Sequence, residues 1–200
     1  MIVANARSAE DFIDSLFDVF ARCSSHRYVV GDVTMVAHML QTAVLAEQAG
    51  APNYLIAAAL LHDIGHFGTD FATDDIGSRH AEMRKQQIDR RHEQAGAQLL
   101  TTFFGPRVTE PIRLHVAAKR YLCAVEPAYL DKLAPTSKHT LKLQGGVMAA
   151  AEIGEFETSP HASDAVRLRR WDDSAIVPGL RTTPCEHYWG LLEGLSADPP

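Results

Sequence analysis

The chain has 200 residues, 46% of them apolar, and a formal net charge of −6 from 19 basic and 25 acidic residues. This length favours a single domain over residues 1–200, and the apolar share allows a buried core. No apolar run reaches the ~18 residues that a membrane span needs, and a mildly acidic chain without a long basic stripe is a poor binder of nucleic acid. We therefore expect neither a membrane nor a nucleic-acid partner. Ten histidines are present, against eight Phe and two Trp, and imidazole is the commonest metal ligand.

The N-terminus and the cysteines favour a cytoplasmic protein. The first residues, MIVANARSAEDF, lack a basic segment followed by an apolar stretch, so they do not resemble a secretory signal. Cys23, Cys123 and Cys185 are an odd number, lie far apart and form no CxxC pair. This pattern argues against a disulfide framework and against a structural zinc site.

Hydrophobic periodicity predicts a first helix over residues 8–22. Phe12, Leu16 and Phe20 recur at helical spacing, and Ser8 can cap the N-terminus.

Two further helices follow in the next third of the chain. The first is predicted to be capped by Asp32 and to end at Gly50, with Pro52 just beyond. The second is predicted to be capped by Asn53 and to contain the segment YLIAAALLHD. This segment is apolar on all sides, so we expect it at the centre of the domain.

The remaining chain is also predicted to be helical. The polar, glycine-containing segment 65–86 reads as a loop or lid. Gly105-Pro106 separates two of the later helices, which are expected over 88–103, 107–117, 137–156, 161–174 and 185–195. No segment alternates as a strand would, so we predict an all-α fold. Its core would cover about 28–180, with helices 8–22 and 185–195 packed on it.

A candidate metal site begins at the end of the most apolar helix, where His62 and Asp63 stand in the string HDIGH. Adjacent helical residues point ~100° apart, so the two side chains cannot bind one ion in the same way. They can serve two neighbouring ions if the carboxylate bridges them. Other helices each offer one polar side chain for such a bundle site: His38, His92, His115 and Asp172. Oxygen and imidazole donors without a thiolate suit iron, manganese or zinc.

Some of these positions have competitors. His80 competes with His92, which we prefer because Glu93 and an amphipathic helix follow it, and Asp173 competes with Asp172. The remaining histidines stand in surface-like contexts: His26, His139, His161 and His187.

The order His…His-Asp…His…His…Asp on helices resembles the HD-domain superfamily over roughly residues 30–175. Most members hydrolyse phosphate esters with one or two metal ions. The two additional histidines, His92 and His115, imply the di-metal kind.

A narrower resemblance depends on several strings in order. VVGDVTMVAHMLQ after Tyr28, then HDIGH, HEQAGA, IRLHVAAKRYL, Tyr129, Ser137, LQGGVM and LRRWDD look like the phosphonate-degrading oxygenases of this superfamily. The resemblance implies an HD-domain helical bundle with two iron ions inside, in the mixed-valent Fe(II)/Fe(III) state, and O2 as co-substrate. It also implies cleavage of the C–P bond of a small organophosphonate, a 1-hydroxy-2-aminoethylphosphonate, with release of phosphate and an amino acid.

The resemblance assigns residues to the two irons and to the substrate. His38, His62, Asp63 and Asp172 would hold one iron, and His92, His115 and the bridging Asp63 would hold the other. The implied substrate contacts are Tyr28, His66, Lys119, Ser137, Gln144 and Arg169. Two of these, Lys119 and Arg169, are cations about one helical turn from the proposed ligands His115 and Asp172. A dianionic phosphonate requires such positive charge in an acidic protein.

One departure from the family pattern bears on the substrate. The aminoethyl-type relatives carry an acid three residues after the tyrosine, whereas this chain has Gly31 there and Asp32 one residue later. A quaternary ammonium needs no carboxylate partner and favours an aromatic face such as Tyr28. We therefore favour the trimethylamino substrate, giving glycine betaine, over the primary amine, giving glycine.

Two other functions remain open at this point. One is a metal-dependent phosphohydrolase of nucleotides or phosphate monoesters, which would work without O2. The other is a non-catalytic signalling or scaffold domain, against which the complete ligand set argues. The sequence predicts no oligomeric state.

Overall fold

In the computed structural model, residues 6, 8–23, 33–67 and 91–196 are described, and these form helices and no strand. The all-α prediction is confirmed. The elements in chain order are α1 (Ala9–Cys23), α2 (Met35–Gln48), α3 (Asn53–Leu61), η2 (Ile64–Phe67), α5 (His92–Leu100), α6 (Pro106–Val125), α7 (Pro127–Lys132), α8 (Pro135–Leu143), α9 (Ala150–Thr158), α10 (Ala162–Ser174), η4 (Cys185–Tyr188) and α11 (Trp189–Ser196).

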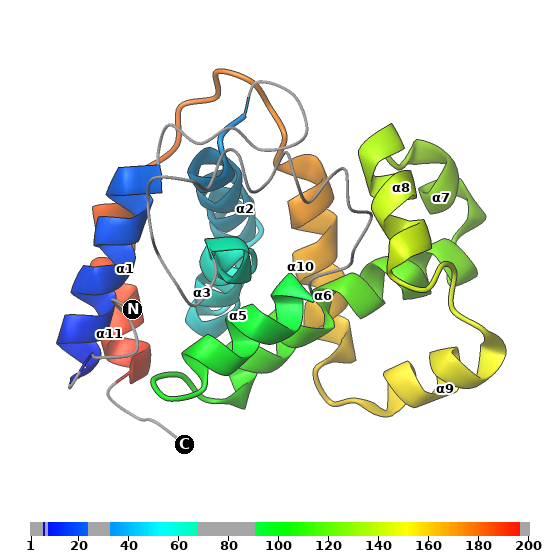
Figure 1. The fold of residues 1–200 in the computed structure, drawn as a ribbon, viewed down its shortest axis with the longest axis horizontal. Coiled ribbons are helices and arrows are strands. Elements are labelled where there is room, and N and C mark those ends of the chain that lie inside the picture. Colours follow the sequence, from blue (N-terminus) through cyan, green and yellow to red (C-terminus); the bar gives the residue numbers. More distant parts are fainter. Residues whose placement is uncertain (1–5, 7, 24–32, 68–90, 197–200) are drawn as a thin grey trace.

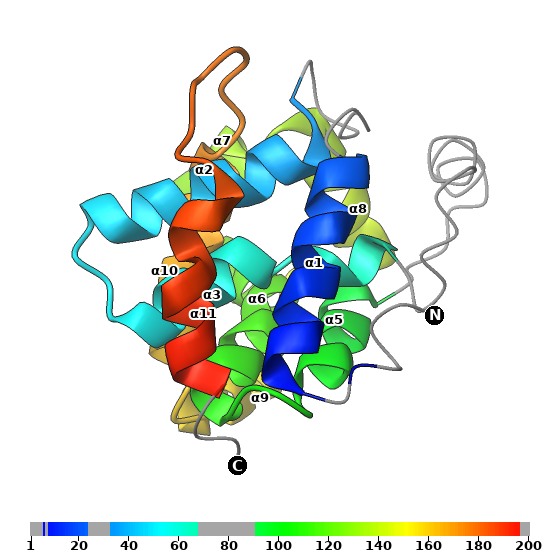
Figure 2. The ribbon, with the colours of Figure 1, turned by 90° about the vertical axis from the view of Figure 1, so that its left-hand side faces the viewer.

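The apolar helix α3 lies at the centre, as predicted (Figure 1). Its residues 55–61 are all buried, and it packs against α2, α6, α10 and α11. A helix that is apolar all round is stable in water only when neighbours cover every side. The helices α1 and α11 lie side by side at one end of the molecule (Figures 1 and 2), and α7, α8 and α9 form the other end.

The apolar core joins the two terminal helices to the central ones. Phe12 and Leu16 of α1 and Leu192 of α11 belong to the same buried cluster as the side chains of α3. A smaller cluster lies between α6, α9 and α10. The boundaries of a single domain over 1–200 stay a prediction. None of the described helices has the length and apolar character needed to cross a membrane.

The first two helices begin and end through local hydrogen bonds. Ser8 caps α1 as predicted, since its Oγ accepts from the Asp11 N–H at 3.1 Å. The side chain of Thr34 caps α2, because its Oγ1 accepts from the Ala37 N–H at 3.1 Å. The predicted cap, Asp32, lies outside the described residues. Gly50 adopts a φ of 64° beyond the end of α2, in agreement with the predicted stop.

The start of α3 differs from the prediction. Asn53 is the first helical residue and not the cap, because the carbonyl of Pro52 accepts the first bonds, from the N–H groups of Leu55 and Ile56. Pro52 has an extended backbone, with φ −66° and ψ 154°, that suits a cap position.

Two predicted helices had the wrong length. The helix predicted over 137–156 is two helices, α8 and α9, because Gly145 and Gly146 adopt positive φ values of 97° and 73° between them. Arg120 closes this turn, donating from Nε to the Gly146 carbonyl at 2.9 Å. The helix predicted over 107–117 continues as α6 to Val125 and ends just before Pro127.

Smaller differences concern other element boundaries. The short helix α7 was not predicted, and the C-terminal helix begins with the 3₁₀ turn η4. Of the predicted loop 65–86, residues 65–67 belong to η2, and the rest lies outside the described residues.

A close approach of two glycines joins η2 to α5. A Cβ added to Gly65 would lie 2.0 Å from the His92 carbonyl oxygen and 2.7 Å from the Gly96 nitrogen. Only a residue without a side chain fits between these backbones. The contact holds the residues just after Asp63 against the first turn of α5, which begins at His92.

We expect Gly65→Ala to lower the free energy of unfolding by about 3 kcal/mol or more, because the methyl group meets backbone that cannot move aside. Chemical denaturation monitored by circular dichroism measures this. The matched control is Gly154→Ala in the exposed face of α9, where nothing lies within 4 Å of the added Cβ. That substitution should stabilise the helix by about 0.5–1 kcal/mol. Equal effects of the two substitutions would contradict the packing described for Gly65.

Candidate metal centre

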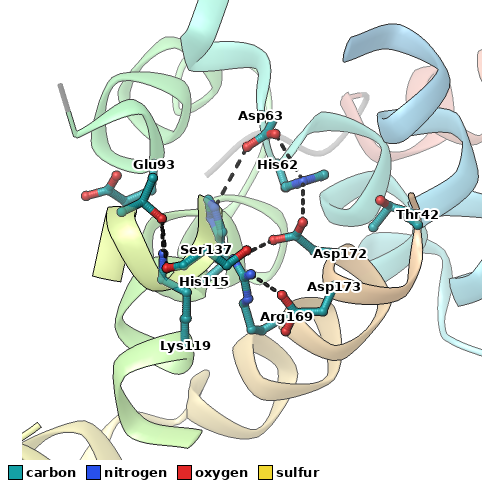
Figure 3. A network of polar contacts seen from close by, with 12 residues as sticks. Thr42, His62, Asp63, Glu93, His115, Lys119, Ser137, Arg169, Asp172 and Asp173 are labelled. Atoms are coloured by element: carbon teal, nitrogen blue, oxygen red, sulfur yellow. Dashed lines mark hydrogen bonds and ion pairs between the residues drawn. The ribbon is translucent and has the colours of Figure 1, made fainter. Parts of the chain in front are cut away.

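Side chains from α2, α5, α6 and α10 converge on His62 and Asp63, beside the end of α3; Figure 3 shows His62, Asp63, His115 and Asp172 among them. The structure brings together all six residues predicted as ligands, and five of them are buried. His38 comes from the first turn of α2, His115 from the middle of α6, and Asp172 from the last turn of α10. The others are His62 and Asp63, which follow α3, and His92, the first residue of α5.

Asp63 stands between two pairs of histidines. Its Oδ2 lies 3.7 Å from Nε2 of His38 and 3.5 Å from Nε2 of His62. Its Oδ1 lies 3.3 Å from Nε2 of His92 and 3.9 Å from Nε2 of His115. The described residues therefore contain two groups that could each hold a metal ion, and the groups share Asp63.

The spacing within each histidine pair fits a metal ion. The Nε2 atoms of His38 and His62 are 3.2 Å apart, and those of His92 and His115 are 3.1 Å apart. Two nitrogens that each lie ~2.1 Å from one ion, at right-angled to tetrahedral geometry, are separated by about 3.0–3.4 Å.

Backbone carbonyls orient three of the four imidazoles. Nδ1 of His38 donates to the Ala175 carbonyl at 3.0 Å, Nδ1 of His62 to Ala59 at 2.9 Å, and Nδ1 of His115 to Ile112 at 2.7 Å. A carbonyl can only accept, so each Nδ1 carries a proton and each Nε2 faces the centre as the atom that could bind a metal ion.

Asp172 and its neighbour Asp173 point to different partners. Oδ1 of Asp172 lies 3.1 Å from Nε2 of His38 and 3.7 Å from Nε2 of His62, which adds a carboxylate to the first metal group. Asp173 instead accepts from the Tyr129 hydroxyl and pairs with Arg169. The geometry thus favours Asp172 over Asp173 as the residue of the metal group.

The electrostatics of the centre favour a bound cation. Burial alone would raise the pKa of Asp63, but the imidazoles of His62, His66 and His92 hold it well below its usual range. Burial would lower the pKa of His62, yet Asp63 and Asp172 raise it to about 9. The buried carboxylates therefore favour positive charge at this position, which a metal ion would supply.

His115 shows the opposite shift. Burial and the charges of His92 and His62 lower its pKa well below the usual value, so its Nε2 stays unprotonated and available as a donor. Cysteine belongs to neither group among the described residues. Nitrogen and carboxylate donors without sulfur fit iron, manganese or zinc.

The predicted substrate residues gather beside this centre, on α6, α8 and α10 (Figure 3). Lys119 is buried, and its Nζ donates to Thr140 Oγ1 at 3.0 Å and to Gln144 Oε1. Burial and the charge of Arg169 lower the pKa of Lys119 to about 8. Ser137, on α8, is partly exposed, and Gln144 directly follows the last residue of this helix.

Of the other predicted substrate residues, His66 lies beside the second metal group and Tyr28 cannot be placed. His66 stacks on His92 with the ring centroids 4.0 Å apart, and its Nε2 lies 3.8 Å from Oδ1 of Asp63. Tyr28 lies outside the described residues, as do Gly31, His26 and His80. The exposed histidines His139 and His187, and the half-buried His161, are not in either metal group.

Thr140 was not predicted from the sequence, although it contacts Lys119 directly. The signal was present, because Thr140 follows Ser137 by three residues and precedes Gln144 by four. That spacing places all three on one face of α8.

Comparisons with known proteins identify the family of the chain. Residues 35–141 match the HD domain family, to which the chain belongs. The chain is 41% identical over 189 residues to [1-hydroxy-2-(trimethylamino)ethyl]phosphonate dioxygenase (glycine-betaine-forming) of Leisingera caerulea, covering 94% of this chain and 91% of that protein. It is 43% identical over 192 residues to hydroxymethylphosphonate dioxygenase of Gimesia maris, covering 96% and 92%. Within the HD-domain family the chain therefore belongs with proteins named as phosphonate dioxygenases.

We expect Asp63→Ala to abolish binding of both metal ions, because this carboxylate serves both groups. His115→Ala should remove only the second ion, since His38, His62, Asp63 and Asp172 remain. Metal content per chain, measured by elemental analysis after loading with iron and desalting, gives the result. His139→Ala, which changes an exposed histidine, is the control and should bind as much iron as the unaltered protein. Two ions retained in Asp63→Ala would show that Asp63 is not the bridge.

Proposed function

We propose that this protein is a di-iron oxygenase that cleaves the C–P bond of a 1-hydroxyphosphonate with O2. The favoured substrate is 1-hydroxy-2-(trimethylamino)ethylphosphonate, which would give phosphate and glycine betaine. The observation that carries the proposal is the pair of ligand groups sharing Asp63 next to the buried cation Lys119.

The residues of the centre fit two iron ions. His38, His62, Asp63 and Asp172 would hold one, and Asp63, His92 and His115 the other. When bound in the Fe(II)/Fe(III) state, the irons would supply Lewis acidity toward the hydroxyphosphonate and the redox chemistry with O2. In the overall reaction the C–P bond breaks, the hydroxyl-bearing carbon becomes a carboxylate, and phosphorus leaves as phosphate. The carbon and the phosphorus each gain one oxygen atom, and the two atoms of O2 account for this gain.

Lys119 is the best-placed group to bind the phosphonate. Its ammonium has three N–H donors, of which Thr140 and Gln144 accept two. The third has no partner among the described residues, and both acceptors are neutral, so the charge remains available to an anion. Because the side chain is only 3% exposed, an ion pair formed there would be largely desolvated and strong.

The second proposed cation, Arg169, is closer to the metal ligands. Its Nη1 lies 2.7 Å from Oδ2 of Asp172, whose Oδ1 faces His38 and His62. Arg169 would therefore both hold the ligand Asp172 and contribute positive charge to the anion site. Ser137 and Gln144 would complete that site with neutral polar groups. His66 would line the side of the site that faces the metal ions.

Hydroxymethylphosphonate is the second candidate substrate. The relative that acts on it by name is 43% identical to this chain, about as similar as the relative named for the trimethylamino compound. The two substrates share the hydroxyphosphonate group that Lys119 and the irons would bind. They differ only in the substituent on the hydroxyl-bearing carbon. Tyr28 and Gly31 are the residues that we expect, from the sequence, to lie near this substituent.

A panel of substrates tests the proposal. Protein loaded with iron is mixed with the trimethylamino compound, its primary-amine counterpart and hydroxymethylphosphonate, and O2 consumption and phosphate release are followed. We expect equal amounts of O2 consumed and phosphate released, with the trimethylamino compound turned over fastest. Faster turnover of either other compound would overturn the substrate assignment. Hydrolysis of nucleotides without O2, by protein free of iron, would overturn the proposed reaction.

We expect Lys119→Ala to retain both irons but to weaken substrate capture by about 2–5 kcal/mol, because a buried ion pair is lost. The loss should appear in kcat/KM. Lys138→Ala is the matched control, since Lys138 is an exposed lysine of α8 that donates only to the Asp131 carbonyl. Loss of iron in Lys119→Ala would show that the lysine supports the metal centre and not the substrate.

A further inference from the structure

The guanidinium of Arg169 is held by three partners at once. Nη1 pairs with Oδ2 of Asp172 at 2.7 Å, Nη2 pairs with Oδ1 of Asp173, and Nε donates to the Tyr129 hydroxyl oxygen at 3.3 Å. A guanidinium has five N–H donors, so two remain without a partner among the described residues. With 7% of its surface exposed, the side chain has little room to move.

Tyr129 closes this network from another helix. Its hydroxyl donates to Oδ2 of Asp173 while its oxygen accepts from Arg169, so the three side chains form a ring of hydrogen bonds. Tyr129 belongs to α7 and packs beside a small buried cluster of Cys123, Leu133 and Leu141. The network therefore joins α7 to the end of α10 that carries the ligand Asp172.

We propose that Tyr129 is a positioning residue for the anion site. By holding Asp173 and Nε of Arg169, it keeps the guanidinium beside Asp172 with its two remaining N–H groups available to the phosphonate. The inference rests on the proposed function only in that Arg169 contacts the phosphonate. Within the described part of the chain, the side-chain hydrogen bonds of Tyr129 reach Asp173 and Arg169, and none reaches a metal group or Lys119.

A simpler electrostatic account makes different predictions. If Asp173 only screened the charge of Arg169, removing its negative charge would strengthen anion binding, and removing the tyrosine hydroxyl would change nothing. If the ring of hydrogen bonds positions Arg169, both changes weaken anion binding. The sign of the effect of Asp173→Asn therefore separates positioning from screening.

The test uses inorganic phosphate as the probe, titrated calorimetrically into the iron-loaded protein. We expect Tyr129→Phe to raise the Kd for phosphate about tenfold, and Asp173→Asn to raise it as well. In turnover with the best hydroxyphosphonate, KM should rise for Tyr129→Phe while kcat stays within about twofold. Iron content should be unchanged, because no metal group includes Tyr129.

The matched control is Tyr121→Phe. Tyr121 also donates its hydroxyl to a carboxylate, Oε1 of Glu157 at 2.9 Å, but at a partly exposed site. It should leave the Kd for phosphate unchanged. Unchanged phosphate binding in Tyr129→Phe, tighter binding in Asp173→Asn, or no phosphate binding by the unaltered protein would each overturn the inference. Failure of the iron-loaded protein to oxidise any hydroxyphosphonate would instead overturn the proposed function, and the phosphate titration would still decide the role of Tyr129.

Discussion

The structure depends on one buried negative charge, the carboxylate of Asp63, placed between two pairs of imidazoles. A buried carboxylate is costly unless positive charge compensates it. Together with Asp172, this carboxylate raises the pKa of His62 to about 9, so the position favours positive charge. The fold holds this arrangement in place through the all-apolar α3, which ends directly before it, and through the contact of Gly65 with α5. A di-metal centre would satisfy the same electrostatic requirement.

The candidate metal centre and the proposed anion site share α6 and α10. On α6, Lys119 follows His115 by one turn, and on α10, Arg169 precedes Asp172 by three residues. Helical spacing thus fixes each cation relative to a proposed ligand. The helix α8 covers Lys119 through Thr140 and Gln144, and α7 holds Arg169 through Tyr129. These two helices would therefore determine how an anion sits beside the irons.

Much of this site could be predicted from the sequence, because HDIGH ends an apolar helix and the other ligands recur on helices in a recognisable order. The fold class followed from periodicity alone. Tyr129 is part of the family resemblance, but the sequence could not give its contacts, nor could it identify Thr140, since both depend on how α7 and α8 pack against α10 and α6. The break at Gly145 and Gly146 was missed because both glycines stand within a run that otherwise suits a helix. The prediction that Asn53 caps α3 was wrong because Pro52, one residue earlier, takes the N-cap position.

The central claim is that Asp63 joins two metal ions into one centre. Electron paramagnetic resonance of the iron-loaded, half-oxidised protein tests it most directly, since a shared carboxylate couples the spins of Fe(II) and Fe(III). The account predicts a single exchange-coupled signal with two irons per chain, and its loss in Asp63→Ala. The signal of an isolated ferric ion, or a single iron per chain in the unaltered protein, would contradict it.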